Sequence, residues 1–320
     1  MADSMVPAGD LLVAPESDLI RTDGRPGPQW RHELRRIPNL ANAASVVFLY
    51  VQTAAVVAVA VWLDNPLTWL VAFVLMGRAV AQFNMLMHEA AHRLLFSNKA
   101  VNDFCGRWIL GYPVFAPTDL YRRGHMAHHR EEFGPQEPDI ALYRGYPIAR
   151  ASMRRKLLRD ASGITGLKLM RGLMAGLVSG SAAVRKVAWS ILATQAVIAA
   201  VFALAGHPWL YLFLWLLPYL TVWRVLNRLR SIAEHGGMVR SRDRRETTHS
   251  VRQHVPARFL MVPYHHGWHL AHHVDPGVPH RKLPALHEEL VRSGYVQPGL
   301  EHRSYPALWR RLASGRSDGA

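Results

Sequence analysis

The sequence predicts an all-α integral membrane protein, with four transmembrane helices in two hairpins and a helical cytoplasmic cap. Two stretches carry this prediction, because residues 37–63 and 187–223 contain no Asp, Glu, Lys or Arg. A helix needs about 20 apolar residues to cross the hydrocarbon core of a bilayer. The first stretch is therefore long enough for one transmembrane helix of a hairpin, and the second stretch is long enough for both helices of another.

The four spans are expected at about 44–63, 67–87, 187–205 and 209–223. Short turns join them in pairs, with Asp64-Asn65-Pro66 inside the first hairpin and residues 205–208 inside the second. These turns contain no Lys or Arg, whereas segment 88–186 contains 16. Because positively charged loops stay in the cytoplasm, we expect this segment and both termini to be cytoplasmic.

Three regions follow from this topology. Residues 1–42 are expected to form an N-terminal cytoplasmic segment, residues 43–292 the membrane domain, and residues 293–320 a C-terminal tail. The first residues lack a basic start followed by an apolar run, so no signal peptide is expected. We therefore expect a multi-pass protein of a bacterial-type inner or cell membrane, inserted through its internal spans.

The composition excludes several classes of protein. The net charge of +15 and the pI of about 10.6 would suit a nucleic-acid binder, but such a protein has no use for long charge-free runs. We expect no nucleic-acid partner. Cys105 is the one cysteine, so a disulfide scaffold is excluded, and an apolar content of 50% excludes a disordered chain.

Histidines gather in three clusters, here called boxes one, two and three. They are His88-Glu-Ala-Ala-His92, His125-Met-Ala-His128-His129 and His269-Leu-Ala-His272-His273. On a helix, offsets of 0, 3 and 4 residues fall within an arc of about 100°, so each box is expected to point its rings at one place. Imidazole binds iron, copper, zinc and nickel. Eight histidines exceed the three or four ligands of one zinc ion and suit two metal ions.

The predicted topology places all three boxes on the cytoplasmic side. His235 lies on an expected helical extension of the fourth span, on the same side, and is the ninth candidate ligand. His265 and His266 immediately precede box three and are expected to support the ligands or to be solvated. The other histidines are expected to be ordinary surface or loop residues: His32, His207, His249, His254, His280, His287 and His302.

Box one has a second interpretation, because His88-Glu89-Ala-Ala-His92 also matches the H-E-x-x-H motif of zinc metalloproteases. Glu89 would then be the general base of an intramembrane protease. This alternative leaves boxes two and three without a purpose. A metal transporter is also possible in principle, but transport sites lie near the middle of the bilayer, outside which the boxes are predicted.

The three boxes, in this order and between two pairs of spans, resemble the membrane-bound fatty acid desaturase family, which includes hydroxylases and ketolases. The stretch Glu137-Pro138-Asp139 after box two and the Pro-rich stretch after box three extend the resemblance over roughly residues 40–292. The resemblance implies a non-haem di-iron centre. Its implied ligands are His88, His92, His125, His128, His129, His235, His269, His272 and His273.

The resemblance also implies residues that support the ligands. In some family members an Asn one helical turn before the lone histidine holds a water on iron, and Ser231 stands at that position here. Four more residues are candidates for the same kind of role: Glu89, Asp139, His265 and His266.

The implied reaction is an O2-dependent oxidation of an unactivated C–H bond. The expected activity is a desaturase that introduces a C=C bond into a fatty acyl or similar lipid-like chain. The alternative is a hydroxylase or ketolase acting on a lipid, a carotenoid or a secondary metabolite. The sequence has no G-x-G-x-x-G motif, no cysteine set for an iron–sulfur cluster and no haem-attachment motif. We therefore expect an external electron donor, namely a ferredoxin, a rubredoxin or a cytochrome b5-like protein. Arg154-Arg155-Lys156 is a candidate contact for this donor or for anionic headgroups.

Overall fold

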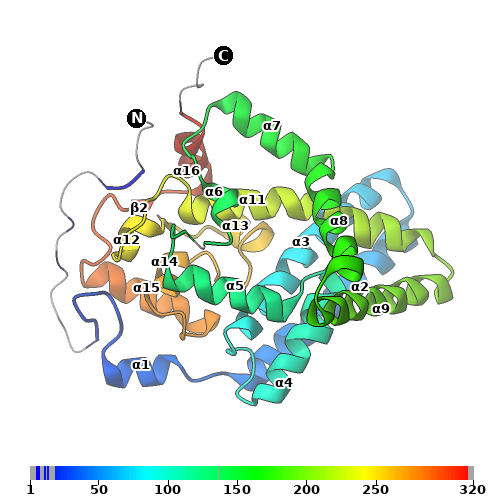
Figure 1. Ribbon diagram of the computed structural model, residues 1–320, viewed down its shortest axis with the longest axis horizontal. Helices are drawn as coiled ribbons and strands as arrows, with labels where there is room; N and C mark the ends of the chain where they lie inside the picture. Colours follow the sequence, from blue (N-terminus) through cyan, green and yellow to red (C-terminus); the bar gives the residue numbers. More distant parts are fainter. Residues whose placement is uncertain (1–4, 8–10, 12, 14–18, 136, 316–320) are drawn as a thin grey trace. The chain divides into compact units, whose positions relative to one another are not determined.

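The computed structural model describes residues 5–7, 11, 13, 19–135 and 137–315, which are mostly helical (Figure 1). They fall into two compact units. Unit 1 comprises residues 1–37, 122–155 and 228–320, and unit 2 comprises residues 38–121 and 156–227. Parts of the predicted terminal regions, residues 1–4, 8–10, 12, 14–18 and 316–320, lie outside the described residues.

Unit 2 contains the long apolar helices. Its elements are α2 (Asn39–Leu63), α3 (Pro66–Ala91), α4 (Lys99–Phe104), η1 (Cys105–Gly111), η2 (Tyr112–Val114), α8 (Ile164–Ser179), α9 (Ala182–Leu204), η3 (Tyr211–Leu216) and α10 (Leu217–Leu220). Helices α2 and α3 pack together as a hairpin. The turn between them is fixed locally, because Asp64 adopts a left-handed conformation and the Asn65 and Thr68 side chains form a capping box at the start of α3.

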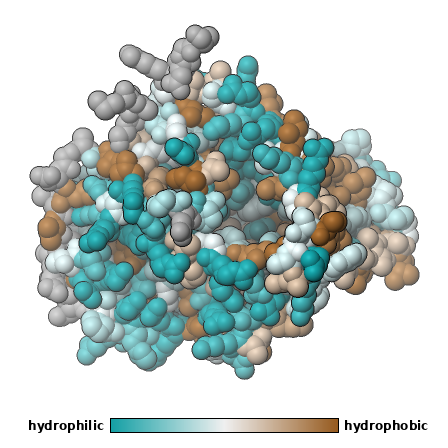
Figure 2. All heavy atoms as spheres, viewed as in Figure 1, coloured by the Kyte–Doolittle hydropathy of each residue, from teal (hydrophilic) through white to brown (hydrophobic). Residues whose placement is uncertain are grey.

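Within the described residues, three helical segments are long and apolar enough to cross a membrane: Pro28–Leu63, Pro66–Ala91 and Ala182–Leu204. The predicted spans 44–63, 67–87 and 187–205 lie in these segments. Exposed apolar side chains on α9, such as Val197, Val201 and Leu204, suit contact with lipid tails. Figure 2 shows hydrophobic residues on the visible face of unit 2, at the right of the view.

The fourth predicted span, 209–223, is not one long helix. It is divided into η3, which has π-helical hydrogen bonding, then α10, and then the start of α11 (Val222–His235). Pro218 contributes to this division, because proline has no backbone N–H to donate to the preceding turn. The prediction of four spans is therefore supported for three helices and stays a prediction for the fourth.

Polar side chains inside unit 2 find partners between its helices. The guanidinium of Arg78 on α3 donates to Gln52 Oε1 at 3.3 Å and to Gln82 Oε1 at 2.9 Å. The buried Gln195 on α9 donates to the carbonyl oxygens of Tyr112 and Pro113 at 2.8 and 2.9 Å. In a bilayer core no water is available to these groups, so such contacts hold the helices together.

Unit 1 contains short helices and one pair of short strands. Its elements are α1 (Pro28–Leu34), α6 (Ile140–Tyr143), α12 (Arg244–Thr247), β1 (Ser250–Val251), α13 (Val255–Leu260), α14 (His269–Val274), η4 (His280–Lys282), α15 (Leu283–Arg292), β2 (Glu301–His302) and α16 (Tyr305–Leu312). Strands β1 and β2 pair in parallel. Helices α5 (Thr118–Arg130), α7 (Arg150–Ala161) and α11 each contain a boundary between the units.

The core of unit 1 lies beneath box three. Leu270, Ala271 and Val274 of α14 pack with Leu286 and Leu290 of α15, and all five side chains are buried. Burial of a leucine side chain stabilises a fold by roughly 1.5–3 kcal/mol. This packing holds a helix of six residues, which would not be stable in isolation.

Candidate metal centre

Boxes two and three lie on two helices of unit 1. Box two lies on the last turns of α5, and box three forms most of α14. All six of their histidines are buried: His125, His128, His129, His269, His272 and His273. Buried imidazoles need partners, so their neighbours define the chemistry of the site.

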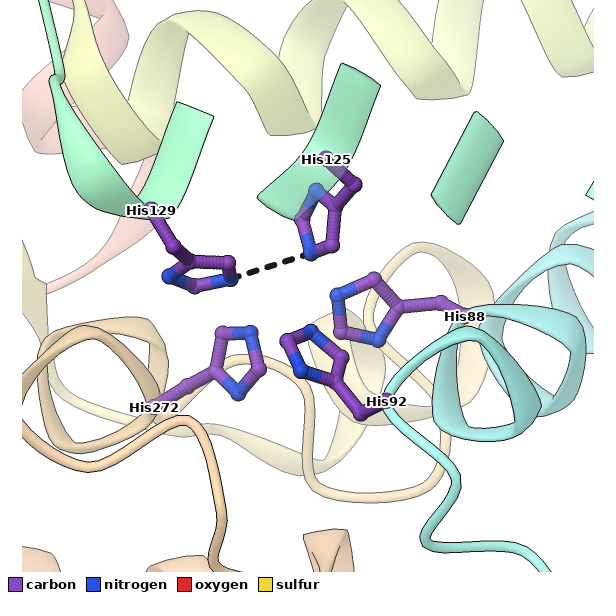
Figure 3. Close-up of side chains that lie close together, drawn as sticks. All are labelled: His88, His92, His125, His129 and His272. Carbon is purple, nitrogen blue, oxygen red and sulfur yellow. Dashed lines mark hydrogen bonds between the residues drawn. The ribbon is translucent and has the colours of Figure 1, made fainter. Parts of the chain in front are cut away.

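The first group of rings, here called cluster A, consists of His125, His129 and His272. Each offers a ring nitrogen within 4.8 Å of the others. The Nε2 atoms of His125 and His129 lie 3.0 Å apart, and Figure 3 shows these two rings projecting from successive turns of α5. The ring centroids of His129 and His272 lie 4.7 Å apart.

The second group, here called cluster B, consists of His128, His235, His269 and His273. The Nε2 atom of His269 lies 3.1 Å from that of His235 and 3.0 Å from that of His273. The ring of His128 lies 4.8 Å from the ring of His235 and 5.0 Å from the ring of His273. His235, which ends α11, thus lies against box three, and its role as a ninth ligand stays a prediction.

Boxes two and three are each divided between the two clusters, which corrects, for these two boxes, the expectation that a box points all its rings at one place. Box two gives His125 and His129 to cluster A and His128 to cluster B. Box three does the reverse, with two rings in cluster B and His272 in cluster A. Helix geometry explains the division. Residues at offsets 0 and 4 differ by about 40° around the helix axis, so their rings point in similar directions, whereas the residue at offset 3 lies about 100° from the residue at offset 4.

Acceptor groups orient the rings of cluster B through their Nδ1 atoms. The Nδ1–H of His128 donates to the Glu137 carboxylate at 2.9 Å, and that of His273 donates to Glu132 Oε1 at 2.5 Å. The Nδ1–H of His235 donates to the carbonyl oxygen of Thr247 at 2.8 Å. An ionised carboxylate or a carbonyl can only accept, so each Nδ1 carries a proton, and in a neutral ring the Nε2 keeps its lone pair.

His269 has the same kind of partner at a longer distance. Its Nδ1 lies 3.4 Å from Glu234 Oε1, and this carboxylate accepts from Arg230 Nη1 at 2.7 Å. Histidines that bind metals in proteins commonly donate their other ring N–H to a carboxylate or a carbonyl. All four rings of cluster B therefore have the surroundings of metal ligands.

Burial keeps most of cluster B uncharged. Burial lowers the pKa of His235 to about 3, and burial followed by the charges of neighbouring histidines lowers the pKa of His269 and His273 well below the ordinary value. For His128, burial lowers the pKa, but the hydrogen bond and charge of Glu137 outweigh it and raise the pKa above the ordinary value. Neutral imidazole is the form that binds metal ions.

The converging Nε2 atoms fit a bound cation. Two neutral nitrogens about 3 Å apart, each with a lone pair and with its proton on the far side of the ring, repel one another. A cation between them removes this repulsion, and imidazole donors suit iron among other transition metals. Clusters A and B are therefore two groups of buried histidines within unit 1 that could each hold a metal ion.

Box one lies in unit 2, on the last turn of α3. The ring centroids of His88 and His92 lie 4.7 Å apart, and Figure 3 shows both rings projecting from the same side of α3. His88 is buried and His92 is half-buried. Glu89 between them is also buried. The ring of Tyr121 lies 6.2 Å from that of His88.

The predicted supporting residues have different positions. Ser231 is buried on α11, one helical turn before His235. The backbone N–H of Asp139 donates to Glu137 Oε1 at 3.1 Å and so helps to hold the partner of His128. His265 and His266 do not belong to cluster A or B as defined above. Their rings stack with His280, at centroid distances of 6.2 and 6.1 Å, and the ring of His266 also lies 6.4 Å from that of His272 in cluster A.

Some histidines expected at the surface are buried, which corrects that expectation. His249, His280 and His287 are buried in unit 1. His249 Nε2–H donates to the carbonyl oxygen of Gly236 at 2.7 Å, so it holds the chain just after α11. No sequence pattern marks these positions, because each is a single histidine outside the three boxes.

Several supporting residues were missed by the sequence analysis. Glu132, Glu234 and the Thr247 carbonyl accept hydrogen bonds or ion pairs from ligand candidates, and the buried Tyr143 ring lies 5.0 Å from that of His235. The signal available for Glu132 and Glu234 was their closeness in sequence to a candidate ligand. No sequence signal marks a backbone carbonyl.

Comparison with known proteins agrees with this geometry. The fatty acid desaturase family profile matches residues 64–306, which include all three boxes. The chain is 26% identical over 243 residues to dihydrorhizobitoxine desaturase of Bradyrhizobium elkanii, across 71% of this chain and 67% of that protein. It is 35% identical over 74 residues to sn-1 oleoyl-lipid 12-desaturase of Arthrospira platensis, across 23% of this chain and 20% of that protein. The chain belongs to the fatty acid desaturase family and is a desaturase-like membrane oxidoreductase.

Proposed function

We propose that this protein is an O2-dependent desaturase whose two irons are held by nine histidines. The observation that carries the proposal is the pair of clusters in unit 1, where boxes two and three each contribute to both. His88 and His92 of box one are the further proposed ligands. Bound iron and O2 supply the oxidising power for C–H cleavage.

The protein's own residues have defined tasks in this proposal. Glu132, Glu137 and Glu234 hold the Nδ1 protons and so fix the directions of the rings. Buried surroundings keep water from the oxidising site. Ser231 stands where some family members have an Asn. Because Ser231 lies one helical turn before His235, we propose that its hydroxyl lies near the metal ligands.

The proposed substrate is a lipid-like or similarly apolar chain. Unit 2 contains an apolar cavity of about 390 Å³, whose lining includes Phe115, Leu173 and Trp223. Asn84 also lines this cavity and precedes His88 by one helical turn on α3. We propose that the reacting chain enters this cavity. The two named relatives are both desaturases, which favours loss of two hydrogens over hydroxylation or ketone formation.

The proposed setting is a bacterial-type inner or cell membrane. We propose that segment 209–223 crosses the bilayer as a broken fourth span, and that both termini and the histidine boxes face the cytoplasm. The support is the absence of Lys and Arg from turns 64–66 and 205–208, against their abundance in segment 88–186.

Lipid mass spectrometry of a desaturase-deficient host that expresses this protein tests the reaction. A product about 2 Da lighter than its precursor supports desaturation, and one about 16 Da heavier supports hydroxylation. Purified protein should contain about two irons per chain, whereas one zinc per chain would support the metalloprotease alternative. The family match over all three boxes favours the desaturase, since the protease motif uses only box one.

Gly172 allows a test of the proposed substrate cavity. It lines the cavity, and a Cβ built at this position meets no atom within 4 Å. Gly172→Leu should therefore fill space without a clash, lowering turnover of long chains while leaving the iron content unchanged. Unchanged turnover by this variant would exclude the cavity as the substrate site.

A further inference from the structure

Unit 1 contains an arginine-rich cavity of about 760 Å³, here called the arginine cavity. Five arginines and two glutamates are among its lining residues. The arginines are Arg25, Arg130, Arg240, Arg242 and Arg244. All except Arg244 are exposed, so the cavity presents its charge to solvent.

The two glutamates of the cavity are already engaged. Glu131 accepts from Arg240, and Glu132 Oε1 accepts from Arg244 at 2.5 Å. The remaining arginines give the cavity an excess of positive charge, and Arg25 makes an exposed contact of 3.9 Å with Asp23. A concave surface of one sign attracts a partner of the opposite sign and speeds its association.

The wall of the arginine cavity touches both clusters of the metal centre. Arg244 Nη1 donates to Glu132 Oε1, and the same oxygen accepts from His273 Nδ1–H at 2.5 Å. Arg244 Nη2 donates to the carbonyl oxygen of His129 at 2.9 Å. Two hydrogen bonds thus lead from the cavity wall to a ligand candidate of cluster B, and one leads to box two.

We infer that the arginine cavity is the docking site of an acidic one-electron carrier protein. The inference depends on the proposed function. In that reaction, each turnover consumes one O2, one substrate chain, two electrons and two protons, and yields one C=C bond and two waters. The sequence has no motif for an electron-carrying cofactor of its own. Each carrier that docks is oxidised by one electron, so two docking events supply one turnover.

The arginine cavity is a better docking site than Arg154-Arg155-Lys156 on α7. Arg155 donates to Ser152 of its own helix. Among the described residues, no hydrogen bond joins Arg154 or Arg155 to a histidine box. The arginine cavity combines positive charge with a hydrogen-bonded connection to the metal ligands. The α7 cluster has the charge alone, which makes it a matched control.

The test compares two double variants with equal changes in charge, Arg130→Glu with Arg242→Glu and Arg154→Glu with Arg155→Glu. The iron-loaded full-length enzyme in detergent is titrated with three acidic carriers: a plant-type [2Fe–2S] ferredoxin, a rubredoxin and a cytochrome b5. The readouts are the Kd of each carrier at low and high ionic strength, the iron content, and the rate at which the reduced carrier is reoxidised.

The cavity variant should bind its carrier at least about tenfold more weakly at low ionic strength, with iron content unchanged, while the α7 variant binds like the wild type. Three results would overturn the inference: no carrier binds the wild type, both variants weaken equally, or the cavity variant loses binding to phosphatidylglycerol vesicles instead. A wild type that contains no iron would refute the proposed function itself. A cavity variant that contains iron and binds the carrier as tightly as the wild type would refute the docking site alone, so the two failures are distinguishable.

Discussion

Boxes two and three share one motif but are built differently. Box two ends a helix of 13 residues, whereas box three occupies a helix of six. Each gives the rings four residues apart to one cluster and the remaining ring to the other. The comparison teaches that the motif H-x-A-H-H specifies how the rings are shared, whereas stability comes from the surroundings of each helix.

The largest expected effect comes from removing the ring that each box gives to the other cluster. His128→Ala removes a ligand from cluster B, and His272→Ala removes one from cluster A. Each should abolish turnover and lower the iron content by about one per chain, because each variant removes one of the histidines proposed to hold one of the two irons. Metal analysis and lipid mass spectrometry measure both. The exposed His32→Ala is the control, and full iron content in His128→Ala would contradict the division into clusters.

A smaller effect should follow from the acceptors of cluster B. Glu132→Gln and Glu137→Gln keep the shape of the side chain but remove the charge that holds the Nδ1 protons of His273 and His128. Metal affinity should fall about 10–100-fold, as for other partners of metal-bound histidines. Competition with a chelator measures this affinity. The exposed Glu288→Gln should behave like the wild type, and an equal loss there would exclude a specific role for the acceptors.

The short helix of box three should depend on its ion pair. Asp275 ends α14, is buried, and accepts from Arg31 Nε at 2.6 Å and Nη2 at 3.2 Å. Asp275→Asn should lower the free energy of unfolding by about 1–3 kcal/mol, because a buried hydrogen-bonded charge is lost. Denaturant unfolding in detergent measures this. Asp23→Asn, at an exposed pair, should change stability by less than about 0.5 kcal/mol.

The smallest effect concerns a buried histidine outside both clusters. Burial, followed by the charge of Arg281, lowers the pKa of His280 to about 3. Below pH 6.5 the unfolded chain gains a proton here that the folded protein does not, so stability is lost as the pH falls. His280→Leu should remove this loss, about 1 kcal/mol between pH 6.5 and pH 5.5. Thermal unfolding at both pH values measures this loss of stability. An equal loss in the wild type and in His280→Leu would exclude the effect.

The sequence predicted the three long helices well, and the ligand roles of the histidines stay a prediction. Charge-free runs locate α2 and α9, and a largely apolar run interrupted by Arg78 locates α3, because a bilayer selects composition over about 20 residues. The break near Pro218 was missed, since the apolar run continues through it. The boxes were found because three rings at helical spacing are visible in one short segment.

Which rings from different segments meet in each cluster was not predictable to the same degree. This meeting depends on how α14 packs on α15 and on where α11 ends, and these are tertiary contacts. The same holds for the acceptors, since His273 uses Glu132 from a segment 141 residues away. His235 could be proposed from its place in the chain, but its Thr247 partner is a backbone oxygen with no sequence signature.

The contact of Arg78 with Gln52 and Gln82 has a mechanical consequence for box one. Sliding α2 along α3 by a helical turn, about 5.4 Å, would strand a guanidinium in hydrocarbon. The hairpin is therefore locked in one register by a charge. His88 lies ten residues after Arg78 on the same helix, about 15 Å further along its axis. The register of the hairpin therefore also sets the position of His88 along that axis relative to α2.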